Sequence, residues 1–242
     1  LQISLLTATL IGVNGIDGLA SPLSVFDGWN TISAEDTPKT TNYVDPGYGG
    51  QFFDAEYLFY KIENKILYIG LQSGFDLVDG EYKHTDNKYY YAGDLAVSFD
   101  GNNSTYEYAV DFGLYTEDYA KNDGDPTNNG LTGDKVEADT FINGKDDAGF
   151  YSVTKWNNDI AFPTSSPFAM DGGEQKADLV ANDMGSGTTA DGTSYYRIVE
   201  LSLSSIAAYL PTNWTTGGFT LDLHWTMSCG NDEIAGTATI PG

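Results

Sequence analysis

The chain has 242 residues, of which 35 are acidic and 11 are basic, so its formal charge at neutral pH is −24. This charge repels the phosphates of nucleic acids and of anionic membranes, so neither is an expected partner. No apolar run approaches the roughly 20 residues that a membrane-spanning helix needs, so no membrane span is expected. High acidity supplies oxygen ligands for hard cations and favours a secreted, extracellular location.

The first thirteen residues, LQISLLTATLIGV, are apolar and uncharged. Exposing each large side chain would cost about 1.5–3 kcal/mol, so this segment is expected to join a sheet as a strand. That sheet is either its own or that of another copy, to which it would add as a donor strand. The glycines of 14–18 form a hinge. We expect a strand and hinge over 1–18 and a single domain over 19–242. The proposed subunit contacts are Leu1, Ile3, Leu5, Leu6, Ala8, Leu10 and Ile11.

Two hairpins are predicted in the first half of the chain. Apolar and polar side chains alternate along the arms, as in strands with one buried face. In the second hairpin, residues 100–104 tolerate positive φ or bond to their own backbone, which favours a turn. The predicted arms are 55–62 with 66–72, and 95–99 with 106–112. Upstream, 20–50 is rich in turn residues, with Phe26 and Trp29 as expected core anchors.

The second half alternates polar stretches with short strands. Segments 116–149 and 171–191 are rich in Asp, Asn and Gly, which is typical of long loops. One helical turn is predicted at 204–211, where Pro211 ends it. Strands are predicted over 151–156, 195–203, 219–227 and 234–240. Many short strands joined by turns indicate an all-β protein, a single antiparallel β-sandwich with long loops.

Three stretches carry a resemblance: GYGGQFFDAEYLF (47–59), YYAGDLAVSFDG (90–101) and HWTMSCGNDEI (224–234). They resemble segments of secreted bacterial proteins with PEP-CTERM-type sorting tails. Those proteins are similar in turn to family 9 carbohydrate-binding modules and DOMON-like domains. ELSLSSI (200–206) is similar to the strand and short helix of that wider group. The resemblance implies a jelly-roll sandwich like that of family 9 modules and a location at the cell surface.

Acidic and amide side chains stand at the ends of several predicted strands. The resemblance implies that these ends converge, which would create an oxygen-rich site for a structural Ca²⁺ ion. The alternative is that the same side chains cap turns through nearby backbone amides. The candidate ligands are Asp54, Glu56, Asp94, Asn231 and Asp232.

The sequence contains no pattern typical of catalysis. It lacks the GxSxG elbow of serine hydrolases. Of the two histidines, His84 lies in a polar loop, and His224 lies in a predicted strand, where a hydrogen-bonded structural role is expected. With 35 acidic residues, carboxylate pairs say nothing about glycoside hydrolysis. We therefore expect a protein that is not an enzyme. Cys229, the single cysteine, is expected to be buried.

Two functions remain as hypotheses. The first is an extracellular structural subunit that polymerises with copies of itself into a filament through its N-terminal strand. The second is a calcium-stabilised carbohydrate-binding module, in which exposed aromatic rings stack on a polysaccharide. Its candidate rings are Tyr89, Tyr90 and Tyr91, although tyrosines also fill sandwich edges. Asn102, Asn103 and Asn213 match the N-glycosylation pattern.

Overall fold

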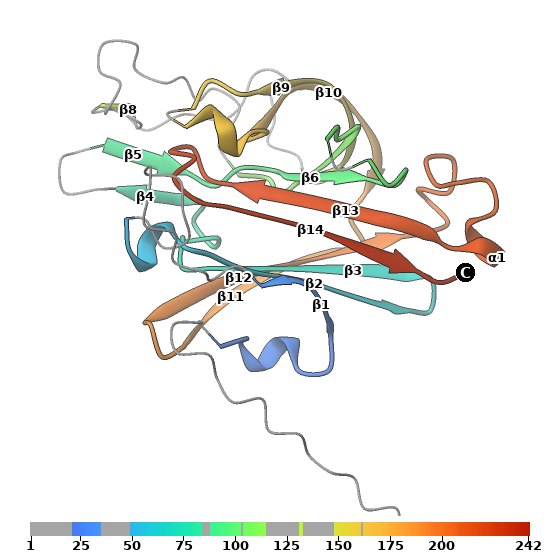
Figure 1. Cartoon of the computed structure of the whole chain (residues 1–242), viewed down its shortest axis with the longest axis horizontal. Helices are drawn as coiled ribbons and strands as arrows, with labels where there is room; N and C mark the ends of the chain where they lie inside the picture. The colour runs from blue at the N-terminus through green and yellow to red at the C-terminus, as the bar shows by residue number, and fades with distance from the viewer. Residues whose placement is uncertain are drawn as a thin grey trace, which may run out of the picture.

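The computed structural model describes residues 21–34, 49–83, 88–102, 104–114, 131–132, 148–160 and 162–242. Within these ranges, two antiparallel sheets face each other across one main hydrophobic cluster (Figure 1). This arrangement confirms the prediction of an all-β antiparallel sandwich. Among the described residues, no helix is long and apolar enough to span a membrane.

One sheet has five strands in the order β1-β2-β3-β12-β11. The hairpin predicted around residues 63–65 is confirmed, and its turn places Asn64 and Lys65 at φ values of 52° and 64°. Positive φ at both positions matches the right-handed twist of the two arms. The strand bounds are Asn30–Ala34 for β1, Ala55–Glu63 for β2, Ile66–Ser73 for β3, Ala181–Thr188 for β11 and Thr193–Ser202 for β12.

The other sheet has six strands in the order β10-β9-β7-β6-β13-β14. The second predicted hairpin is confirmed as β6 and β7, with Leu95 opposite Val110 and Val97 opposite Tyr108. The strand bounds are Leu95–Ser98 for β6, Tyr108–Asp111 for β7, Gly149–Asn157 for β9, Ala169–Asp178 for β10, Phe219–Thr226 for β13 and Glu233–Ile240 for β14.

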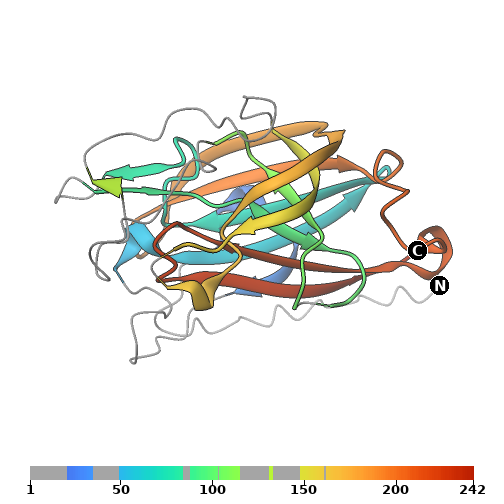
Figure 2. The same ribbon diagram turned by 90° about the horizontal axis from the view of Figure 1, so that it is seen from above.

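The two ends of the sandwich differ. A small sheet of β4, β5 and β8 lies at one end, and the short helix α1 (Trp214–Gly217) lies at the other (Figures 1 and 2). The small strands are Glu81–Lys83, Lys88–Tyr91 and Leu131–Thr132. Three single 3₁₀ turns complete the described elements: η1 (Ser24–Phe26), η2 (Gln51–Phe53) and η3 (Pro163–Ser165).

The main core is formed by alternate side chains of the two sheets. Trp225 of β13 is fully buried there, and its indole Nε1 donates a hydrogen bond to the Gly93 carbonyl at 3.0 Å. The predicted burial of Cys229 is confirmed. Phe26 is also buried, but it stacks on Phe59 with ring centroids 4.3 Å apart, in a separate cluster. The η1 segment therefore covers the outer face of the five-stranded sheet (Figure 1).

Two sequence-based expectations about local structure are wrong. Segment 171–191, whose composition is typical of a loop, lies mostly in strands β10 and β11. These are edge strands of the two sheets, and their side chains face water often enough to hide any apolar alternation. Segment 204–211 forms successive turns instead of a helix. Ile206 and Leu210 hold this segment because both are buried in the main core. They are four positions apart, which is the spacing that a helix would also show.

Candidate ligand-binding site

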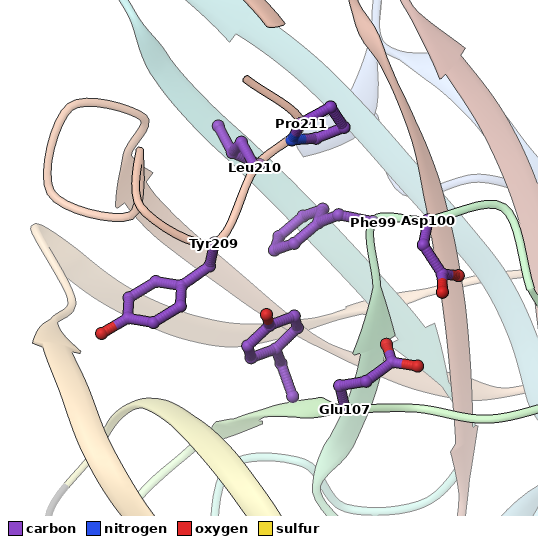
Figure 3. Close-up of a pocket in the computed structure, with 7 residues that line it drawn as sticks. Phe99, Asp100, Glu107, Tyr209, Leu210 and Pro211 are labelled. Carbon is purple, nitrogen blue, oxygen red and sulfur yellow. The ribbon is translucent and has the colours of Figure 1, made fainter. Parts of the chain in front are cut away.

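A pocket of about 270 Å³ opens at the α1 end of the sandwich. It is built from two segments that are far apart in the sequence. One is the loop end of the β6–β7 hairpin, and the other is the run of turns after β12. Aromatic and apolar side chains form its walls, and two carboxylates stand at its rim. The lining residues are Phe99, Asp100, Glu107, Tyr108, Tyr209, Leu210 and Pro211 (Figure 3).

The walls of this pocket are held by the core. Phe99 continues from β6 into the main cluster and is 3% exposed, and Leu210 is 6% exposed. The Tyr108 ring lies 5.6 Å from Phe99 and 5.7 Å from Tyr209, measured between centroids. The Phe150 ring stacks on Tyr108, with ring centroids 5.2 Å apart. The aromatic surface is therefore fixed before any ligand binds.

Asp100 and Glu107 stand on one side of the pocket, and Tyr209 stands on the other (Figure 3). The Ser98 hydroxyl and the Asn102 amide donate to Oδ1 of Asp100 at 2.9 and 2.8 Å. The Thr105 hydroxyl donates to Oε1 of Glu107 at 3.1 Å. Within the described part of the chain, the second oxygen of each carboxylate has no hydrogen-bond donor. Each carboxylate is thus oriented by the hydrogen bonds to one of its oxygens, and its second oxygen is available to a ligand.

The two phenols of the pocket are hydrogen-bonding groups. Burial, followed by the charges of Glu107 and Asp100 and the nearby Tyr209, raises the pKa of Tyr108 above its usual value. A neutral phenol can both donate and accept a hydrogen bond. Neither the Tyr108 nor the Tyr209 hydroxyl has a partner among the residues that the structure describes. The pocket therefore offers aromatic faces, two phenols and two carboxylate oxygens to a ligand.

A second hollow of about 430 Å³ lies at the same end of the molecule. It is lined by Ile62, Lys65, Leu203, Trp214, Thr215, Phe219, Ile240, Pro241 and Gly242. Lys65 is the only charged side chain among the described residues of this lining. Binding sites combine an apolar lining with a few convergent polar groups, and the pocket at Phe99 meets that description better.

The structure does not place Tyr89, Tyr90 and Tyr91 as a stacking platform. Tyr90 is 7% exposed in the main core, and Tyr91 is 1% exposed in a second cluster with Ile160 and Phe168. Successive strand residues point to opposite sides, and both sides of β5 are covered here. Tyr89 is half-buried against the second cluster. The expectation of three exposed rings is wrong for Tyr90 and Tyr91, and these tyrosines fill the edge of the sandwich instead.

The five candidate calcium ligands do not gather as one group. Within the described ranges, no three His, Cys, Asp or Glu side chains are close enough to share a metal ion. The Asp232 carboxylate accepts from the Ala55 and Glu233 amides at 2.7 and 2.9 Å, and Asp94 accepts from the Met170 amide at 2.7 Å. Asp232 thereby ties the start of β2 to the turn before β14. Of these donors only the Glu233 amide is a nearby backbone group, as the alternative interpretation requires, whereas the Ala55 and Met170 amides are distant in the sequence. Calcium binding stays a prediction.

Glu56 is separated from the other candidate ligands by a β-bulge. The β2–β3 register shifts between Ala55 and Tyr57, so the side chain of Glu56 leaves the strand end. Its carboxylate accepts from Gln51, Ser194 and Gln72 at 2.7, 2.8 and 2.6 Å. Burial raises its pKa, against the lowering effect of these donors. Glu56 thus organises a buried cluster of polar side chains, in which Gln72 also accepts from the Leu23 amide.

Three further expectations have different outcomes. His224 is a buried strand residue, and its Nε2 donates to the Ser165 carbonyl at 3.0 Å, as expected of a structural histidine. Asn102 and Asn213 are exposed, and their glycosylation stays a prediction. Asn103, His84 and the donor-strand residues Leu1, Ile3, Leu5, Leu6, Ala8, Leu10 and Ile11 lie outside the described residues.

Sequence analysis missed the pocket, although part of its signal was present. The alternation in 95–99 and 106–112 places Phe99 and Tyr108 on the inward face of one hairpin, next to its connecting loop. It does not indicate that Tyr209, about a hundred positions later, completes the wall. Comparisons of the chain with protein-family models, with curated proteins and with solved structures found no match.

Proposed function

We propose that this protein is a secreted, non-catalytic module that binds carbohydrate in the pocket between Phe99 and Tyr209. One observation carries the proposal: a preformed aromatic pocket with two carboxylate oxygens and two phenols that have no hydrogen-bond partner among the described residues. Sugar rings present apolar C–H faces that pack on aromatic rings, and hydroxyl groups that donate to carboxylates. The resemblance to carbohydrate-binding modules and the high acidity of the chain support the same proposal.

The dimensions of the pocket favour recognition of a short part of a glycan. Its volume of about 270 Å³ lies just below the range of roughly 300–1,000 Å³ found for small-molecule sites. It is therefore sized for one or two sugar units, such as a chain end or a branch. A long polysaccharide would extend beyond it along the α1 end of the molecule.

Tyr209→Ala is expected to weaken glycan binding about 10-fold, because it removes one wall of the pocket. Tyr209→Phe keeps the ring and is expected to stay within about 3-fold of wild type. A glycan array selects the ligand, and isothermal titration calorimetry gives the affinities.

The matched control is Tyr68→Ala, on the outer face of the five-stranded sheet, where the Tyr68 ring packs against Trp29. This variant removes an equal ring away from the pocket and is expected to bind like wild type. A wild-type protein without any glycan ligand contradicts the proposal. So does a Tyr209→Ala variant that binds as tightly as wild type.

A second candidate function is assembly into a homopolymer, and the open edge of β11 favours it. The eight-residue register of β11 with β12 has no bulge, and its other side has no partner strand in the described structure. Met184 and Val180 at this edge are 49% and 55% exposed. Regular strand edges without a partner accept added strands. Leu23 lies against Gly187 of β11, so the first described residues of the chain lie beside this strand.

Deleting residues 1–13 tests the homopolymer function. If this segment adds to β11 of another copy, the full chain forms filaments visible by electron microscopy, and the deleted chain is a folded monomer. Met184→Lys at the β11 edge is expected to block assembly as well, because edge lysines prevent strand addition. An unchanged oligomeric state in both variants rules out donation, and an unfolded deletion variant assigns the segment to its own domain.

A further inference from the structure

The charges around the pocket at Phe99 identify a class of sugar. Among the described residues, Asp100 and Glu107 are the charged groups of its lining, and no described lysine or arginine contributes to it. A ligand with only hydroxyl groups would satisfy the hydrogen bonding of these carboxylates and leave their two charges without a counterion. An ammonium group would satisfy both, because charge-assisted hydrogen bonds are roughly twice as strong as neutral ones.

The aromatic walls favour the same kind of group. The ring centroid of Tyr108 lies 5.6 Å from that of Phe99 and 5.7 Å from that of Tyr209, and the three rings line the same pocket as the two carboxylates. Figure 3 shows Tyr209 on one side of this pocket and Asp100 and Glu107 on the other. A cation over an aromatic face is attracted by about 0.5–2 kcal/mol, and more strongly where water is excluded. The pocket therefore has two independent attractions for a positive charge.

The rest of the molecule adds a long-range attraction. A net charge of −24 produces a negative potential that raises the local concentration of cations and repels uronic acids and sulfated or phosphorylated glycans. Neutral sugars would experience neither effect. The preference for one glycan over another thus follows from charge. Stacking on the aromatic rings contributes similarly to the affinity for every glycan.

We infer that the pocket recognises a cationic amino sugar, such as a glucosamine unit of a deacetylated polysaccharide. The sugar ring stacks against Tyr209 and Tyr108, and the ammonium group lies between the open oxygens of Asp100 and Glu107. N-acetylation abolishes the charge and adds bulk, so the acetylated unit binds more weakly. This inference rests on the proposed carbohydrate function and specifies its ligand.

Titration calorimetry with three hexasaccharides tests the inference. The probes are the glucosamine, N-acetylglucosamine and glucose β-1,4 oligomers, measured at a pH of about 6, below the ~7.7 at which an α-amino group titrates. The glucosamine oligomer is expected to bind at least about 10-fold more tightly than the other two, and this preference is expected to shrink with added salt.

The double variant D100N/E107Q is expected to reduce the preference to within about 2-fold, because it removes both charges of the pocket while keeping a side-chain oxygen at each position. Asn at position 100 keeps a side-chain oxygen for the Asn102 amide, so the turn is preserved. The single variant E107Q is expected to lose part of the preference. The control D183N/D191N removes the same charge from exposed positions in and after β11 and is expected to keep the full preference.

The outcomes separate the two claims. If none of the three oligomers binds, the amino-sugar inference is overturned, and the glycan array decides whether the carbohydrate function stands. If all three bind equally, or if D100N/E107Q keeps the preference for glucosamine, the carbohydrate function stands and the amino-sugar inference is overturned. A preference that both double variants lose equally assigns it to the net charge of the protein and also overturns the role of the two carboxylates.

Discussion

Trp225→Ala is expected to lower the free energy of unfolding by about 3–5 kcal/mol, the range for truncation of a large buried aromatic side chain. Trp225 has no exposed surface and contacts Phe75 across the core, with ring centroids 6.5 Å apart. Its loss also leaves the buried Gly93 carbonyl without the indole donor. A domain with a total stability of about 5–15 kcal/mol retains little after such a change.

Urea unfolding followed by circular dichroism measures this loss. Trp225→Phe keeps a ring in the core and is expected to lose less, which keeps the prediction measurable when the alanine variant is too unstable to purify. Trp29→Ala is the matched control, because Trp29 is only half-buried against the outer cluster. A Trp225→Ala variant within about 1 kcal/mol of wild type contradicts the assignment of Trp225 to the centre of the sandwich.

Acidification is expected to destabilise the fold through His224. Burial lowers its pKa from 6.5 to about 4, against the opposing effect of the Ser165 and Pro167 carbonyls. Its contribution to stability is therefore complete above the unfolded pKa of about 6.5 and is lost as the pH falls from there toward 4. A shift of this size corresponds to roughly 3 kcal/mol.

The variant H224Q isolates this effect, since glutamine can donate to Ser165 without titrating. As the pH falls from 6.5 to 4, we expect the unfolding free energy of wild type to decrease more than that of H224Q. Glu56, whose pKa is raised, acts in the opposite direction, because its ionised form is disfavoured by burial and acid relieves that cost. Its contribution cancels in the difference. Parallel stability curves for the two proteins contradict a neutral buried His224.

The parts of the fold that could be predicted are those in which burial on one face dictates the sequence. In β13, four inward residues alternate with polar ones, and the predicted strand 219–227 matches Phe219–Thr226 closely. Strands β10 and β11 could not be predicted in this way, because an edge strand buries little. Strand β1 lies in a segment whose composition is that of turns, and it exists because it pairs with β2.

The candidate site was harder to predict because it depends on contacts between distant segments. The loop end of the β6–β7 hairpin can be predicted from the sequence. The position of Tyr209 beside that loop depends on how Ile206 and Leu210 are buried in the core. Glu56 illustrates the opposite error. Its position in the sequence suggests a ligand beside Asp54, and a single bulge in β2 turns it toward Gln72 and Ser194 instead.

The most direct test of the central claim is a ¹H–¹⁵N NMR titration of the protein with a glucosamine oligosaccharide. If the pocket is the binding site, the largest amide shift changes occur at Phe99–Asp100, Glu107–Tyr108 and Tyr209–Leu210, the residues that line it. Amides of the small sheet at the opposite end are expected to stay unchanged. Shift changes centred away from the pocket, or no changes at millimolar ligand, would show that the pocket does not bind this sugar.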